Sequence, residues 1–357
     1  MVDVVDVRSG RDYKHLEEGD IPVYGTGGYM LSVNEALSDD EDAIGIGRKG
    51  TIDNPYILRA PFWTVDTLFY AVPRDKYDLN FVFDIFQNVN WKAKDESTGV
   101  PSLSKATINA VETLMPEYAE QKKIGEYFSY LDNFITLHQR KCDETKKLKK
   151  FMLQKMFPKK DAKKPEIRFA GFTDDWEQRK LGEVIQEYSE KNHPELPALT
   201  IIQGGGTVLR EESERKLQYD KSSLAGYKMV REDDFIVHLR SFEGGLEKSN
   251  HNGLISPAYH TFHGDEVDSR FYYPYFRSYE FIKHKLVPHV YGIRDGRSID
   301  IDSMKTIEIP WTSYEEQKKI GDYIESLDTL ITLHQRKCDE LKEFKKYMLQ
   351  NMFPQKG

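Results

Sequence analysis

EQKKIGEYFSYLDNFITLHQRKCDETKKLKKFMLQ, residues 120–154, recurs as EQKKIGDYIESLDTLITLHQRKCDELKEFKKYMLQ at residues 316–350. The two copies are identical at 25 of 35 aligned positions, with a constant offset of 196 residues, and Met-Phe-Pro closes each one. The segments before the copies, 1–110 and 169–310, barely resemble each other. The chain is therefore a tandem arrangement in which matched segments follow two different globular parts.

Each copy has the spacing of a helix that pairs with another helix, because apolar or small residues recur at steps of four and three. Each such helix would be roughly 50 Å long. We expect the two copies to pair as an antiparallel coiled coil with pseudo-twofold symmetry; the alternative is that each helix packs only on its own domain. The expected seam comprises Ile124, Phe128, Leu131, Ile135, His138, Cys142, Thr145, Leu148 and Met152 in the first copy, and Ile320, Ile324, Leu327, Ile331, His334, Cys338, Leu341, Phe344 and Met348 in the second.

The globular segments read as α+β, since short Val/Ile/Phe/Tyr runs alternate with Gly, Asn and Asp. The fold class expected is thus two mixed α/β domains, each followed by a long helix. The expected boundaries are 1–112 for the first domain, 116–157 for its helix, 158–168 for a charged, proline-bracketed linker, 169–310 for the second domain and 312–354 for its helix.

Composition limits the class of protein. The chain of 357 residues has room for two domains, and no apolar run is long enough to cross a membrane. Two cysteines are no disulfide framework, which predicts a reducing, cytoplasmic location. The net charge of −8 argues against a protein that holds nucleic acid unaided, so positive charge must be local or supplied by a partner.

Two motifs resemble nucleotide or methyltransferase signatures and are better read as turns. Gly45-Ile46-Gly47-Arg48-Lys49-Gly50 matches G-x-G-x-x-G, but a turn and not a helix follows it. We expect a tight turn that presents Arg48 and Lys49. Residues 53–56, Asp-Asn-Pro-Tyr, lack the second proline of the adenine methyltransferase motif and have no glycine-rich cofactor loop upstream.

No metal or catalytic constellation is evident in the sequence. His138 and His334 each precede a cysteine by four residues, a spacing that could ligate zinc, but seam packing explains it more simply. No arrangement of Ser, His, Asp or Cys suggests nucleophilic catalysis.

Several polar loops carry donors suited to nucleic acid. Glycine lets backbone approach phosphate, Ser, Thr and Lys suit phosphate oxygens, and Arg suits phosphate or guanine. The candidate DNA-binding residues are Tyr24, Thr26, Tyr29, Arg48, Lys49, Thr51, Ser102, Ser104 and Lys105 in the first domain, and His238, Arg240, Ser241, Tyr259, Tyr291, Arg294 and Arg297 in the second. Taken singly, each is more often a plain surface residue.

Together these features resemble the specificity subunit of type I restriction-modification systems, over nearly the whole chain. The resemblance rests on the paired E-Q-K-K-I-G helices, G-F-T-D-D-W-E-Q-R-K-L-G-E at 171–183, I-P-V-Y-G-T-G-G-Y at 21–29, I-G-R-K-G-T-I at 46–52, P-F-W-T-V-D-T-L-F-Y at 61–70, T-G-V-P-S-L-S at 98–104 and L-I-S-P-A-Y at 254–259. In that family a W-E-x-x-K-L-G-type segment also opens the first domain. This chain shows it only in the second, so the usual start of the first domain is expected to be missing.

The resemblance implies two target recognition domains that each read one half of a bipartite, asymmetric site in double-stranded DNA. It also implies that the coiled coil sets the unread spacer and scaffolds two methyltransferase subunits. No cofactor is expected in this chain; S-adenosylmethionine and ATP would bind methyltransferase and restriction subunits. The competing interpretations are a coiled-coil adaptor that binds only proteins and, less favoured, an adenine methyltransferase.

Overall fold

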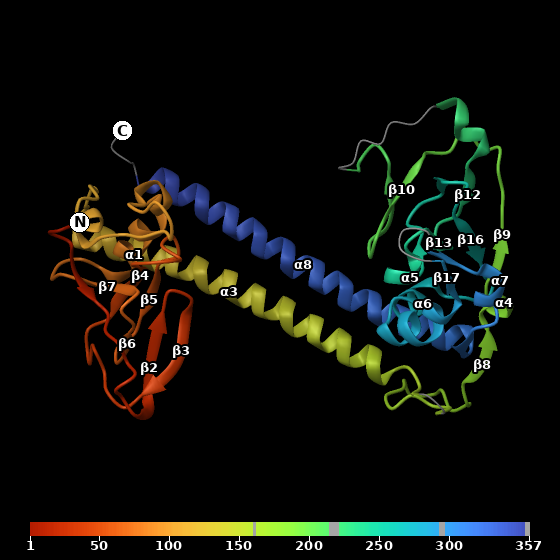
Figure 1. Ribbon diagram of the computed structural model, residues 1–357, viewed down its shortest axis with the longest axis horizontal. Helices are drawn as coiled ribbons and strands as arrows, with labels where there is room; N and C mark the ends of the chain where they lie inside the picture. Colours follow the sequence, from red (N-terminus) through yellow and green to blue (C-terminus); the bar gives the residue numbers. More distant parts are fainter. Residues whose placement is uncertain (160–161, 214–220, 293–296, 354–357) are drawn as a thin grey trace. The chain divides into compact units, whose positions relative to one another are not determined.

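The computed structural model describes residues 1–159, 162–213, 221–292 and 297–353. The chain forms two compact units: Met1–Lys141 with His334–Gly357, and Cys142–Leu333. We call these the first and second unit. Each contains one globular domain together with a stretch of both long helices, α3 (Tyr118–Lys155) and α8 (Tyr314–Met352) (Figure 1). In the described residues, no helix is both long and apolar enough to span a membrane.

The first unit is built on two sheets. An antiparallel sheet has the order β1 (Val5–Ser9), β7 (Leu68–Pro73), β4 (Ala43–Gly47), β5 (Tyr56–Leu58). A smaller sheet pairs β3 (Gly28–Val33), β2 (Glu18–Gly25) and β6 (Trp63–Thr64). The helices α1 (Leu79–Asn88) and α2 (Lys105–Asn109) and the 3-10 turn η1 (Trp91–Lys94) complete the domain before α3 begins.

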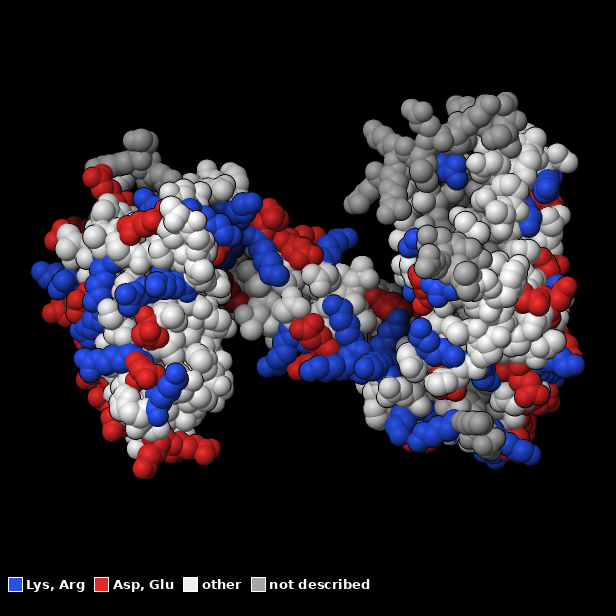
Figure 2. Space-filling view, in the orientation of Figure 1, with Lys and Arg blue, Asp and Glu red and all other residues white. Residues whose placement is uncertain are grey.

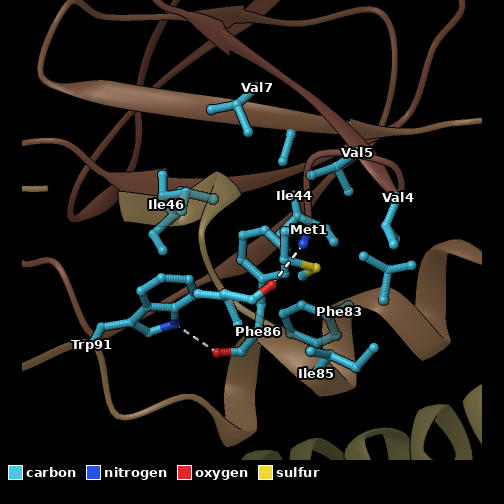
Figure 3. Close-up of a cluster of buried hydrophobic side chains, with 14 of the residues drawn as sticks. Met1, Val4, Val5, Val7, Ile44, Ile46, Phe83, Ile85, Phe86 and Trp91 are labelled. Atoms are coloured by element: carbon cyan, nitrogen blue, oxygen red, sulfur yellow. Dashed lines mark hydrogen bonds between the residues drawn. The ribbon is translucent and has the colours of Figure 1, made fainter. Parts of the chain in front are cut away.

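The core of the first unit lies between the larger sheet and α1. Val5, Val7, Ile44 and Ile46 project from the sheet toward the apolar face of α1 (Figure 3). The same cluster takes in Phe128 and Leu131 of α3 and Leu349 and Phe353 at the end of the chain's second long helix. The domain therefore packs on both helices.

In its described residues, the second unit contains one four-stranded sheet and four two-stranded pairs. Its four-stranded sheet has the order β14 (Glu247–Lys248), β13 (Phe235–Val237), β16 (His260–His263), β9 (Gln186–Tyr188). The pairs are β8 (Glu177–Lys180) with β19 (Glu308–Trp311), β10 (Leu199–Ile202) with β11 (Gly206–Leu209), β12 (Lys228–Val230) with β15 (Gly253–Ile255), and β17 (Val290–Tyr291) with β18 (Ser298–Ile299).

Helical segments complete the second unit. The α-helices are α4 (Leu181–Val184), α5 (Ser241–Gly244), α6 (Ser269–Phe276) and α7 (Ile301–Met304). The unit also contains a 3-10 turn η2 (Lys221–Gly226), a π-helical turn η3 (Glu280–Leu286) and a second 3-10 turn η4 (Val287–His289). The core joins α6 and η3 to the sheets and to Ile320 and Ile324 of α8.

The opening of the second domain is fastened to the start of α8. Arg168 makes two bonds to the Glu316 carboxylate, at 2.7 and 2.8 Å, and Trp176 Nε1 donates to the same group at 3.1 Å. Glu316 is 1% exposed, so this carboxylate needs such partners to be buried. The Gly-Phe-Thr-Asp-Asp-Trp opening therefore has a structural purpose.

The expected antiparallel pairing of the long helices is confirmed, and its contacts recur in both units. Cys338 Sγ lies 3.8 Å from Ile135 O in the first unit, and Cys142 Sγ lies 3.7 Å from Ile331 O in the second. Those residues correspond through the 196-residue repeat. Because each domain also packs on both helices, the alternative of helices that pack only on their own domains is wrong.

The seam itself needs one correction. Leu148 and Phe344, which we expected on it, are each 44% exposed. The regular alternation of steps continues instead through Lys149 and Lys345, whose amines meet Asp328 and Asp132 across the coil at 2.6 and 2.5 Å. A long lysine stem can be buried while its amine is paired, so an apolar pattern alone misplaces this position.

Candidate functional site

The repeated E-Q-K-K-I-G segment docks each helix on its domain in the same way. Gln121 Oε1 accepts from Asp78 N at 3.1 Å, and Gln317 Oε1 accepts from Asp268 N at 3.1 Å. Asp78 and Asp268 are the N-caps of α1 and α6. The motif thus joins two unlike domains to two helices of closely similar sequence.

Three predicted loops meet in the first unit. The turn at Arg48–Gly50 is bonded to the 101–103 segment, since Leu103 N donates to Arg48 O at 3.0 Å and Gly50 N to Pro101 O at 2.8 Å. Thr26, at the tip of the β2–β3 hairpin, also reaches this turn, because a Cβ built on Gly50 would lie 4.0 Å from Thr26 Oγ1. Segments far apart in the sequence therefore form one surface.

An open, shallow cavity of about 420 Å³ lies between two of these loops. It gathers the predicted residues Arg48, Lys49, Ser102, Ser104 and Lys105. Ser9, Leu103 and Phe69 also line it, and sequence reasoning missed them. The alternation in Val5–Ser9 marks a strand, but only its pairing with β7 places Ser9 beside Phe69. We call this the basic cavity.

The hairpin tip carries aromatic side chains. Tyr29 is 62% exposed, and its ring meets Tyr24 edge-on at a centroid distance of 6.3 Å. Tyr24 also lies 6.0 Å from Tyr56, whose hydroxyl donates to Gly25 O at 2.6 Å. Burial raises the pKa of Tyr56, which keeps it a neutral donor. The exposed Tyr29 therefore packs on Tyr24, which packs in turn on the hydrogen-bonded Tyr56.

Both sequence motifs fall on the segment that runs from β4 through a loop into β5, and neither leads directly into a helix. Gly45 and Gly47 lie in β4, and β5 follows them. A Cβ on Gly47 would lie 1.9 Å from Thr51 O, and Gly50 has φ +91°, so the glycines permit a tight reversal and no nucleotide loop. Arg48, Lys49 and Thr51 are exposed on it. Asp53, in the Asp-Asn-Pro-Tyr segment, pairs with Lys92 at 2.6 Å.

The second unit brings together part of its predicted set. The His238 and Tyr259 rings meet edge-on at a centroid distance of 6.2 Å. Arg297 lies over the ring of Phe242 at 4.4 Å and reaches Glu243 at 3.4 Å. Arg240, just before α5, is exposed, and Tyr291 is 61% exposed. Arg294 lies outside the described residues.

His238, in the segment between β13 and α5, is held neutral. Its Nδ1 accepts from Arg240 N at 3.3 Å, and its Nε2 is buried with no hydrogen-bond partner in the described ranges. Burial is the main cause that lowers the pKa of His238; Arg277 adds to the fall and Glu247 opposes it. The ring thus supports the loop as an uncharged group.

Ser241 needs a correction as a binding candidate. It is 0% exposed, and its Oγ accepts from His238 N at 2.9 Å. A short Ser side chain near a helix start satisfies local backbone, which the sequence could have suggested. Ser104 likewise caps α2 by accepting from Thr107 N at 3.1 Å.

The sequence did not predict the buried carboxylate of Glu247, which lies in β14 and bonds to the turn at residues 204–206. Glu247 is 0% exposed and accepts from Gly204 N at 2.8 Å, from Tyr273 Oη at 2.7 Å and from Arg277. A lone Glu in a strand gives no signal in sequence. Its bonds fix the 204–206 turn.

The paired histidines of the seam contact each other and no metal set forms around them. His138 Nδ1 and His334 Nδ1 are 3.1 Å apart, and both seam cysteines are buried. Over the ranges that the structure describes, no three His, Cys, Asp or Glu side chains are grouped to hold a metal ion.

Charge is mixed on the one face of the molecule that is in view in Figure 2, where basic and acidic side chains are intermingled. This agrees with the net charge of −8. Because the net charge is negative, the chain can attract an anion only through local groups, such as those of the basic cavity.

Comparisons with known proteins point to one family. Residues 2–147 match the family described as Type I restriction modification DNA specificity domain. The chain is 26% identical over 279 residues to the type I restriction enzyme MjaVIII specificity subunit of Methanocaldococcus jannaschii, covering 72% of this chain. It is 24% identical over 281 residues, 74% of this chain, to the putative MjaX specificity subunit of the same organism.

The chain covers 65% and 63% of the lengths of those two relatives. Among solved structures, a type I restriction-modification system S subunit from M. genitalium aligns with a TM-score of 0.66 at 14% identity, covering 100% of this chain and 96% of that one. That likeness shows a shared fold.

Proposed function

We propose that the chain belongs to the type I restriction-modification specificity-subunit family and is the non-catalytic subunit that gives such a complex its DNA sequence specificity. Each domain reads one half of a bipartite, asymmetric site in double-stranded DNA. The paired helices set the unread spacer and scaffold two methyltransferase subunits. Those subunits would use S-adenosylmethionine, restriction subunits would use ATP, and the complex would act in the cytoplasm.

The observation that carries this proposal is the contrast between repeated helices and unlike domains. The Lys149–Asp328 contact of the second unit corresponds, through the 196-residue repeat, to the Lys345–Asp132 contact of the first. The loops that each unit exposes share no such correspondence. A constant support with two different polar surfaces suits a protein that reads two different half-sites at a fixed separation.

The net charge of −8 fits a subunit that does not hold DNA alone. Phosphate neutralisation normally needs a basic surface, so the methyltransferase subunits would supply part of it. An adaptor that binds only proteins is the second candidate. It predicts that no duplex is retarded even when methyltransferase subunits are present, whereas our proposal predicts retardation by that complex.

Arg240→Ala tests the division of labour between the domains. Arg240 is an exposed candidate in the second unit, and loss of an arginine fork at a guanine costs about 1–3 kcal/mol of discrimination. We expect relaxed base preference in one half-site only, measured by sequencing the DNA that the complex methylates. Arg240→Lys is the matched variant, because it keeps the charge and loses the fork. Relaxation of both half-sites would contradict the division.

A further inference from the structure

We infer that the basic cavity of the first unit binds a backbone phosphate of DNA and does not read a base. This inference rests on the proposed function and assigns a role within it. Phosphate contacts fix the register of a protein on the duplex, while base contacts carry sequence information. The cavity would therefore position the first domain for reading by other residues.

The frame of the cavity is set by backbone bonds. Arg48 N and Lys49 N both donate to Thr67 O, at 2.8 and 3.3 Å, and residues 49 and 102 form an isolated β-bridge. Asp95 Oδ1 accepts from Ser97 N and Ser102 N, each at 2.9 Å, which secures the second wall. Hydrogen bonds from those two backbone amides, Ser102 first, lower the pKa of Asp95. The cationic side chains thus start from fixed positions.

The lining has the charge that an anion requires. It contains three cations, Arg48, Lys49 and Lys105, and no acidic residue. No carboxylate pairs with these three cations within the described parts of the chain. Elsewhere in the same domain, by contrast, Arg8 pairs with Glu41 and Arg59 with Asp42, each at 2.5 Å. The cavity keeps its positive charge available.

The carboxylate of Glu96 accepts a hydrogen bond from Ser104, one of the hydroxyls that line the cavity. Glu96 Oε1 accepts from Ser104 Oγ at 3.0 Å. Ser104 also caps α2, so Ser9 and Ser102 are the lining hydroxyls left to add hydrogen bonds to phosphate oxygens.

Shape and side-chain chemistry favour phosphate over a base edge. A base edge lies at the floor of a groove and is reached by a protruding element, whereas a phosphate projects from the duplex and fits a concavity. Two of the three cations are lysines, which act as point charges and not as two-pronged readers. Arg48 Nη1 donates to Asp66 O at 3.4 Å, so one nitrogen of its guanidinium group already has a hydrogen-bond partner. Tyr29 and Met30, both exposed on β3 of the β2–β3 hairpin, are side chains of this domain outside the cavity that could reach a base edge.

The test compares Lys49→Ala/Lys105→Ala with wild type in the complete complex with methyltransferase subunits. Binding to a duplex carrying the methylated motif, and to the same duplex with the motif scrambled, is measured across a range of KCl concentrations. We expect both affinities to fall by the same factor. The slope of log K against log salt should become shallower by about 0.9 for each phosphate that the variant no longer neutralises. The methylated motif should not change.

Controls separate this inference from the proposed function. Arg59→Ala, which removes a paired cation outside the cavity, should leave the salt slope unchanged. Lys49→Gln alone, with melting measured in parallel, covers the case in which the double variant fails to fold. If the wild-type complex shows no preference for any duplex, the proposed function fails. If wild type discriminates normally, the inference stands or falls on the variants.

Three results would overturn the inference. An unchanged salt slope would mean that the cavity does not touch DNA. A lowered ratio of specific to scrambled binding at a constant slope would mean that it reads bases. Inorganic phosphate that binds wild type, but not the double variant, without displacing DNA at constant ionic strength would identify a free-anion site instead.

Discussion

Asp84 is a buried carboxyl whose protonation couples the first unit's stability to pH. It is 1% exposed in α1, and its Oδ2 has no hydrogen-bond partner in the described ranges. Burial raises the pKa of Asp84 to about 9; Lys345 opposes the rise, and Asp132 and Asp78 add to it. The unfolded chain releases this proton near pH 4. The free energy of unfolding should therefore fall as pH rises from about 4 to about 9.

Asp84→Asn keeps the shape and removes the titration. We expect the variant to melt higher than wild type at pH 8, and the gap to shrink toward pH 4, as measured by thermal unfolding. Asp39→Asn, at an exposed position, is the matched control. A gap that is constant with pH would contradict this explanation.

The two seam lysines provide an internal comparison. The side chains of Lys345 and Asp132 are 9% and 39% exposed, whereas those of Lys149 and Asp328 are 23% and 52% exposed. Removing one partner of a buried pair costs about 3–5 kcal/mol, and exposed pairs contribute about 0–1 kcal/mol. Lys345 is the more buried lysine, so Lys345→Ala should lower the unfolding midpoint clearly more than Lys149→Ala. Equal losses would show that burial does not set the strength of this contact.

At the scale of elements, two glycines of the repeated motif allow the long helices to dock. A Cβ on Gly321 would lie 2.9 Å from Asp268 Oδ1, and one on Gly125 would lie 2.6 Å from Asp78 Oδ1. Alanine normally favours a helix over glycine by about 1 kcal/mol. Here the added methyl group would press against the N-cap aspartate of a domain helix, so we expect the steric cost to exceed the gain in helix propensity.

Gly321→Ala should therefore destabilise the second unit by about 1–3 kcal/mol. Chemical denaturation followed by the fluorescence of Trp176, which is buried beside the docked helix, measures it. The exposed helical substitution Ser326→Ala should be close to neutral. A stabilised Gly321→Ala variant would mean that the docking contact is not tight.

Long periodic elements could be predicted from sequence, and short irregular ones could not. The repeated segment specified two helices, observed as Tyr118–Lys155 and Tyr314–Met352. It misplaced Leu148 and Phe344, because the position beside each is a lysine whose pairing with aspartate only the folded helices reveal. The described strands of the second domain all have two to four residues, too few for periodicity to mark.

The sequence predicted several residues of the candidate site, but not that they lie together. Loop composition identified Arg48, Lys49 and Lys105, and the fold brings all three to one cavity. Backbone bonds between residues 48–50 and 101–103 create that proximity, and no local pattern encodes them. For the same reason Ser241, a candidate by residue type, is buried at the start of α5.

At the scale of the whole molecule, the helix pair should act as a spacer. One heptad inserted after Lys147, with a matching heptad at the facing point of α8, preserves the seam and adds roughly 10 Å. We expect the unread spacer of the methylated site to grow by about three base pairs, since DNA rises about 3.4 Å per pair. Sequencing of methylated DNA from cells that carry the variant complex measures it. Altered half-sites with an unchanged spacer would contradict the role of the coil.

The most direct test of the central proposal is to co-express the chain with an adenine methyltransferase subunit of the same type of system. Single-molecule sequencing then maps N6-methyladenine in the host DNA. We predict one methylated motif in two specified parts, separated by a spacer of fixed length and unspecified sequence. A stable complex that methylates no motif, or one continuous motif, would contradict the proposal that two unlike domains read two half-sites.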